Sequence, residues 1–157
     1  MSLSSPFDGS CEALCKVNVT DVVNWITSVY KPEDWHKGPD RPFVRNDPAW
    51  EDLAVRTQPV VSQVLKLFSG GIDSYRSITV VHPGDYVPPH TDTQHPGWLS
   101  RIHVPLVTNP GSFLIMDSKS YHLEVGTAYR VNVGKPHAIT NKGKSTRIHL
   151  MFDVSAQ

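Results

Sequence analysis

Two segments in the first half of the chain carry apolar residues at helical spacing. In the first, Thr20 can cap a helix whose apolar positions are Val22, Val23, Ile26 and Val29, which predicts a helix over about 20–30. In the second, Pro59 stands where a first helical turn accepts proline, and Gly70-Gly71 ends a stripe formed by Val60, Val61, Val64, Leu65 and Phe68. Both helices are expected to brace a sheet.

From Tyr75 onward the pattern changes to short runs of β-branched and apolar residues, separated by turn residues at intervals of roughly ten. The predicted strands are 76–82, 101–108, 112–116, 121–125, 129–133, 137–140 and 146–154, with a short first strand over 11–17. Many short strands without a helical interruption are typical of a two-sheet jelly roll. The predicted fold is therefore mainly β, a jelly roll braced by two or more N-terminal helices, with an irregular segment over 31–48.

Length and charge limit the number of domains and the class of partner. At 157 residues the chain has the size of one domain, with a helical and irregular N-terminal part over about 1–74 and a jelly-roll core over about 75–154. Lys plus Arg number 15 and Asp plus Glu number 15, so the formal net charge is +0. No long-range field attracts nucleic acid or an anionic membrane, and we expect neither as a partner.

The start of the chain and its cysteines indicate a compartment. The first residues lack the basic and apolar regions of an export signal, and no apolar run approaches the roughly 18 residues of a spanning helix. Cys11 and Cys15 have no ligand spacing for zinc and no disulfide framework around them. We therefore expect reduced thiols in a cytoplasmic protein.

Histidine is concentrated in the predicted jelly roll. Seven of the eight histidines lie there, namely His82, His90, His95, His103, His122, His137 and His149. Histidine titrates near neutrality and is the commonest metal ligand, so this bias points to chemistry in that half of the chain. The loop over 93–100, which contains His95 and Trp98, is expected at the mouth of a site there.

The tripeptide His90-Thr91-Asp92 can supply two metal ligands. Side chains two residues apart on an extended chain point to the same face, so the His90 imidazole and the Asp92 carboxylate can converge on one ion. Taken alone, such a tripeptide is more often an ordinary surface or turn sequence. Its interpretation depends on a third ligand elsewhere in the chain.

His137 stands at the head of a later strand and is the candidate third ligand. If this strand forms a hairpin with 146–154, His149 lies opposite His137 and Arg147 lies opposite Ile139, all on one face. Two histidines and one carboxylate form the facial triad of non-haem Fe(II) oxygenases, which leaves coordination positions open. A nearby arginine suits the far carboxylate of an α-keto dicarboxylate.

These positions resemble those of the Fe(II)/2-oxoglutarate-dependent dioxygenases, with His90-x-Asp92, then His137, then Arg147 ten residues on. More narrowly, about 76–154 resembles the aspartyl/asparaginyl β-hydroxylase family. The motifs that carry this resemblance are Thr79-Val80-Val81-His82-Pro83-Gly84, Arg101-Ile102-His103-Val104-Pro105-Leu106 and Arg147-Ile148-His149-Leu150-Met151-Phe152-Asp153-Val154. Their joint occurrence in order is more specific than any one of them.

The resemblance implies a double-stranded β-helix, the cupin-like form of the jelly roll, with an Fe(II) centre. The implied iron ligands, and the catalytic centre, are His90, Asp92 and His137. The animal enzyme that names the family lacks a carboxylate at the position of Asp92. This chain therefore has the fuller triad, and the substrate of the animal enzyme is not carried over to it.

The resemblance also implies a site for 2-oxoglutarate as cosubstrate. Arg147, helped by the hydroxyl of Thr79, would bind its distal carboxylate. Arg101 and His103 would contact its metal-binding end, and their spacing of two independently places them on one strand face. The implied reaction uses O₂, releases succinate and CO₂, and hydroxylates an amino acid, either as a small molecule or within a peptide.

Two other functions stay open at this point. One is a cupin-like metalloenzyme that holds a different metal and does not use 2-oxoglutarate. Such sites usually need more histidines in the first cluster than His90 alone. The other is a non-catalytic β-sandwich binding module, which predicts that no metal is bound.

Overall fold

The computed structural model describes residues 3–29, 31 and 50–157. Almost all of the segment predicted as irregular, 31–48, therefore lies outside the described residues. The elements in chain order are β1 (Cys11–Lys16), α1 (Thr20–Val29), α2 (Trp50–Leu65), β2 (Gly71–Val81), β3 (Tyr86–His90), β4 (Trp98–Val107), β5 (Ser112–Met116), β6 (Lys119–Tyr121), β7 (Thr127–Val131), β8 (His137–Asn141) and β9 (Arg147–Ala156).

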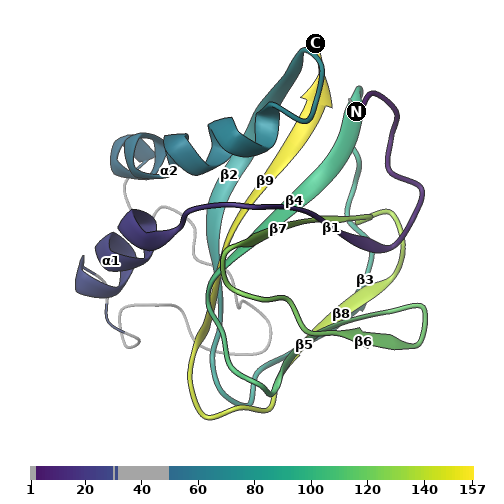
Figure 1. Ribbon diagram of the computed structural model, residues 1–157. Coiled ribbons are helices and arrows are strands. Elements are labelled where there is room, and N and C mark those ends of the chain that lie inside the picture. Colours follow the sequence, from purple (N-terminus) through teal and green to yellow (C-terminus); the bar gives the residue numbers. More distant parts are fainter. Residues whose placement is uncertain (1–2, 30, 32–49) are drawn as a thin grey trace.

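The strands form two antiparallel sheets that face each other (Figure 1). The larger sheet has the order β1-β7-β4-β9-β2, and the smaller has the order β3-β8-β5-β6. A buried apolar cluster joins the sheets, with Val81 and Val131 from the larger sheet and Leu114 and Ile139 from the smaller. The prediction of a mainly β jelly roll is confirmed.

Both helices cover the outer face of the larger sheet (Figure 1). Ile26 of α1 and Val64 of α2 are fully buried against outward-facing strand residues such as Leu150 and Phe152. Burial of a side chain of this kind contributes about 2 kcal/mol, so the helices fix the sheet from behind. The prediction that two helices brace a sheet is confirmed.

The inner face of the same sheet carries polar side chains along its central strands. Along β9, Ile148, Leu150, Phe152 and Val154 point to the helices, so the alternate residues Arg147, His149, Met151 and Asp153 point between the sheets. Their neighbours on this face come from β4 and β2 and include Arg101, His103 and Thr79. Charged and titratable side chains are therefore held on a rigid surface inside the molecule.

The structure corrects the predicted start of the second helix. α2 begins at Trp50, and Pro59 lies inside it rather than in its first turn. Leu53 and Thr57 are buried and continue the helical spacing of Val60 toward the N-terminus. Pro59 is exposed, so the carbonyl that its missing N–H leaves unpaired lies on the solvent side of the helix.

Several predicted strand boundaries are also wrong. β2 begins at Gly71 rather than at 76, and β7 covers 127–131 rather than 129–133. The predicted strand over 121–125 is mostly loop, because the Glu124 N–H donates to the Tyr129 hydroxyl (2.9 Å) instead of to a neighbouring strand. β3 was not predicted because it contains Pro88-Pro89. Its place at the edge of the smaller sheet explains why these residues are tolerated.

The predicted hairpin of 137–140 with 146–154 does not exist. β8 pairs with β3 and β5 in the smaller sheet, whereas β9 pairs with β2 and β4 in the larger one. Asn141 stabilises the connection from β8 in the smaller sheet to β9 in the larger one. Its side-chain amide donates to the carbonyls of Val81 and Ser145, each at 2.9 Å. Arg147 consequently lies opposite Val81 and not opposite Ile139.

Candidate metal centre and cosubstrate pocket

His90 and His137 lie directly opposite each other on β3 and β8, with ring centroids 4.3 Å apart. The Nδ1 of His90 lies 2.8 Å from the Pro88 carbonyl, and the Nδ1 of His137 lies 2.9 Å from the Lys135 carbonyl. Because a carbonyl only accepts, both Nδ1 atoms carry the proton. In a neutral ring held this way, Nε2 is the nitrogen with the lone pair, which is the tautomer that binds a metal.

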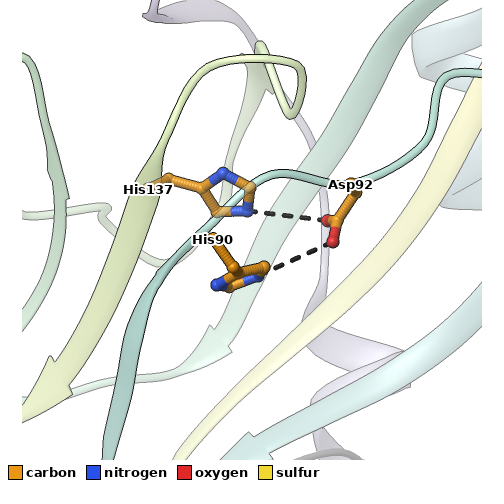
Figure 2. Close-up of side chains that lie close together, drawn as sticks. All are labelled: His90, Asp92 and His137. Carbon is orange, nitrogen blue, oxygen red and sulfur yellow. Dashed lines mark ion pairs between the residues drawn. The ribbon is translucent and has the colours of Figure 1, made fainter.

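Asp92 closes this group from the loop that follows β3. Its Oδ1 lies 3.6 Å from the Nε2 of His90, and its Oδ2 lies 3.5 Å from the Nε2 of His137 (Figure 2). The Asp92 N–H donates to the Val133 carbonyl at 2.8 Å, which fixes the backbone of Asp92 to the loop between β7 and β8. One ligand atom from each of the three residues lies within 4.8 Å of the others.

The electrostatics of Asp92 favour its charged form. The close contact with His137, followed by the positive charge of Arg101, lowers the pKa of the Asp92 carboxyl despite its partial burial. An ionised carboxylate and two imidazole lone pairs are the donor set that non-haem Fe(II) accepts. His90 and Asp92 keep 31% and 32% of their side chains exposed, which leaves access on that side for further ligands. The residues fit a divalent iron.

Arg101 pairs with two carboxylates on this side of the site. Its Nε and Nη2 donate to the two oxygens of Asp153 at 2.7 and 3.1 Å, and its Nη1 donates to the Asp92 Oδ2 at 2.8 Å. Burial disfavours the charge of Arg101, but the hydrogen bonds and charge of Asp153 outweigh it and raise the pKa of the guanidinium. Asp153, only 1% exposed, is a site residue that the sequence analysis did not select.

His103 and His149 form a second, buried histidine pair behind the metal group. Their Nδ1 atoms lie 3.1 Å apart, so one donates a hydrogen bond and the other accepts it. Burial, and next the charge of Arg147, hold the pKa of both imidazoles well below the usual range. Both rings are therefore neutral at pH 7. The expected hairpin partner of His149 was His137, but its actual contact is His103.

Arg147 is almost completely buried, with 3% exposed. Its Nη1 lies 3.5 Å from the Thr79 hydroxyl, and within the described part of the chain no carboxylate lies within ion-pair distance of it. Burial lowers the pKa of its guanidinium to about 9. A buried cation without a carboxylate partner is stabilised by an anion that enters from solution.

A pocket gives such an anion its space. The pocket has about 200 Å³ of free space, including its open mouth, and its lining is Thr108, Ser112, Phe113, Leu114, Tyr121, Leu123, Arg147 and His149. The buried hydroxyl of Ser112 has no hydrogen-bond partner among the described residues. The pocket therefore joins an apolar wall to the buried guanidinium of Arg147 and the unpaired hydroxyl of Ser112.

Of the two residues predicted in the loop at the mouth of the site, His95 and Trp98, the structure places only His95 there. Trp98 is not in the loop but begins β4, where it is 4% exposed and packs into the cluster between the sheets. His95 does lie in the loop, stacked on Tyr75 with ring centroids 4.6 Å apart. The sequence did not predict that Tyr75 would contact His95. Tyr75 has a positive φ of 53°, which no sequence pattern indicates.

Among the described helices none combines the length and the apolar composition needed to cross a bilayer.

Comparisons with known proteins agree with this arrangement. The family described as aspartyl/asparaginyl beta-hydroxylase matches residues 27–157. The L-proline cis-4-hydroxylase of Rhizobium meliloti (strain 1021) is 24% identical over 134 residues, which cover 84% of this chain and 48% of the relative. The chain thus spans about half the length of the curated relative it matches.

Two solved structures show the same fold at low identity. The viral collagen prolyl hydroxylase of Paramecium Bursaria Chlorella virus-1, solved as a 2OG complex, has a TM-score of 0.62 at 12% identity and covers 96% of this chain and 98% of its own. A Pseudomonas putida prolyl-4-hydroxylase has a TM-score of 0.58 at 16% identity and covers 96% and 94%, respectively.

Proposed function

Since the chain belongs to the aspartyl/asparaginyl β-hydroxylase family, we propose that it is an Fe(II)- and 2-oxoglutarate-dependent oxygenase that hydroxylates an amino acid, free or in a peptide. The reaction consumes 2-oxoglutarate, O₂ and a substrate C–H bond, and yields succinate, CO₂ and a C–OH group. The convergence of His90, Asp92 and His137 within 4.8 Å is the observation that carries this proposal. No comparable observation supports the two other functions, a cupin-like metalloenzyme with a different metal or a non-catalytic binding module.

His90, Asp92 and His137 would hold the metal. When bound, Fe(II) supplies the activation of O₂ and the oxidative decarboxylation of the cosubstrate. The protein fixes both imidazoles in the metal-binding tautomer through the carbonyls of Pro88 and Lys135. Among the described residues these three are the ligands it would contribute, which leaves positions for cosubstrate and O₂.

The pocket lined by Arg147 and His149 is the proposed site for 2-oxoglutarate. Arg147 and the Thr79 hydroxyl would bind its distal carboxylate, which supplies the negative charge that the buried guanidinium lacks. Arg101 and His103 would face its metal-binding end. His103 is neutral, so it can donate one hydrogen bond there without adding charge.

The choice of an amino acid as substrate rests on the family and on the named relatives. One of these is an L-proline hydroxylase and two are prolyl hydroxylases, so free L-proline and proline-containing peptides are the first probes. The partial exposure of His90 and Asp92 marks the side from which a substrate would reach the metal.

The test is a panel of amino acids and short peptides incubated with the protein, Fe(II), ascorbate and 2-oxoglutarate. We expect succinate release that depends on one class of substrate, together with a gain of one oxygen in the product by mass spectrometry. His137→Ala should remove both signals while the circular dichroism spectrum stays that of a folded β protein. Tight zinc binding without any response to 2-oxoglutarate would instead favour a cupin-like metalloenzyme. The absence of bound metal after anaerobic purification with added iron would favour a binding module.

A further inference from the structure

We propose that Asp153 is a positioning residue for the metal centre, acting through Arg101 on the ligand Asp92. This inference rests on the proposed function, because it assigns a role toward the metal that function requires. The three side chains form one chain of hydrogen bonds. Asp153 accepts two bonds from Arg101, at 2.7 and 3.1 Å, and Asp92 accepts one from the same guanidinium at 2.8 Å.

Asp153, at one end of this series of hydrogen bonds, is held rigidly. Asp153 is 1% exposed and lies opposite Arg101 in the register of β4 and β9, in the middle of the larger sheet. A buried carboxylate is tolerated only when it is paired and hydrogen-bonded, and here the planar guanidinium satisfies both of its oxygens. The fork of Arg101 is therefore fixed in direction by the sheet and not by solvent.

Asp92, at the other end of this series of hydrogen bonds, needs such support. Asp92 lies in the loop after β3, and its side chain is 32% exposed, whereas its partner His137 is 7% exposed. A carboxylate in that position can turn toward water. The bond from Arg101 Nη1 to Oδ2 holds it toward both imidazoles and leaves Oδ1 free of that donor. Residues that orient metal ligands in this way are worth about 10-fold to 100-fold in metal affinity.

Asp153 also balances charge. Arg101 alone would place an uncompensated cation next to a site for a dication. The ion pair with Asp153 is neutral as a unit, so Asp92 keeps its full negative charge for the metal. The guanidinium also has more N–H groups than these three bonds use, so Arg101 can hold Asp92 and still contact the cosubstrate.

The experiment measures binding of Co(II), which is not oxidised under the assay conditions, to the folded protein without cosubstrate. We expect Asp153→Asn to weaken Co(II) affinity about 10-fold to 100-fold. A matched control is Asp73→Asn, which breaks an aspartate–arginine pair at the edge of the same sheet, between Asp73 and Arg76, where Arg76 faces α2. This control should leave Co(II) affinity unchanged.

A double-mutant cycle separates positioning from a general structural effect. If Asp153 acts through Asp92, then Asp153→Asn should cause no further loss of Co(II) affinity in an Asp92→Ala background. An equal loss in both backgrounds, or no loss in the wild-type background, overturns the proposal. Should Asp153→Asn not fold, Arg101→Gln combined with Asp153→Asn removes both buried charges together, and the same loss of affinity is expected.

The readout distinguishes the two proposals because it does not depend on turnover. Wild-type protein that binds neither Co(II) nor Fe(II) contradicts the proposed function, and the role of Asp153 with it. Wild-type protein that binds Co(II) as tightly as the Asp153→Asn variant contradicts the role of Asp153 alone.

Discussion

His103 on β4 and His149 on β9 face each other inside the jelly roll with their Nδ1 atoms 3.1 Å apart. One ring must donate and the other accept, so protonation of the accepting Nδ1 would break the contact. The charge of Arg147 reinforces this, since it disfavours a second cation nearby. The pair is thus a neutral, buried polar link on the floor of the site.

The first prediction concerns the pH dependence of stability. In the folded protein the pKa of both imidazoles lies well below 6.5, whereas unfolded histidines titrate near about 6.5. Below that pH the unfolded state therefore binds more protons, and stability falls as pH decreases. From pH 7 to pH 5.5 we expect a loss of about 2 kcal/mol from this pair, measured by urea unfolding. In His149→Gln the loss should be clearly smaller, and an unchanged loss would contradict the assignment.

The second prediction concerns the buried cation Arg147. Arg147→Met keeps a similar side-chain volume and removes a charge that burial disfavours, so the free energy of unfolding should stay the same or rise. The apparent affinity for 2-oxoglutarate should fall about 100-fold, because the distal carboxylate loses its partner. Kinetic titration of succinate formation and urea unfolding measure the two effects.

Arg76→Met is the matched control for that prediction. Arg76 is 8% exposed on the same sheet, but it pairs with Asp73 and donates to the Ala54 carbonyl on the helix side. Its loss should destabilise the protein and leave the affinity for 2-oxoglutarate unchanged. If both variants behave alike, the special role of Arg147 is wrong.

The third prediction concerns the metal. An ion that binds only the folded state stabilises it, by about 2.7 kcal/mol at one hundred times its dissociation constant. We therefore expect Co(II) to raise the melting temperature of the wild-type protein and chelation to reverse the rise. His137→Ala should abolish the response, whereas His122→Ala, at an exposed histidine on the loop after β6, should retain it. A full response in His137→Ala would remove that residue from the ligand set.

The sequence was sufficient for the local part of this site. The two-residue spacing of His90 and Asp92 and the alternation along β9 follow from the geometry of an extended chain. The long-range part could not be predicted in the same way. Asn141 turns the chain from one sheet to the other, so the strand with Arg147 does not pair with the strand of His137. The partner of Asp153 likewise depends on a register between strands far apart in sequence.

The helix and loop errors have physical causes of the same kind. Pro59 looks like a helix start because local rules place proline there, but burial of Leu53 and Thr57 extends the helix across it. Leu123 is 5% exposed and mimics a strand position, although the neighbouring backbone bonds to a side chain. Tertiary packing decided both cases.

The last prediction concerns Tyr75, which stacks on His95 beside the loop that carries Asp92. Its φ of 53° lies in the left-handed region, at a bulge of β2, where a Cβ atom costs about 1 kcal/mol or more. Tyr75→Gly should therefore be more stable than Tyr75→Ala by about 1 kcal/mol in urea unfolding. At Ile72, an exposed position of the same strand without a positive φ, the order should reverse, because glycine in a regular strand loses more entropy than alanine. The same order at both positions would show that Tyr75 is not strained.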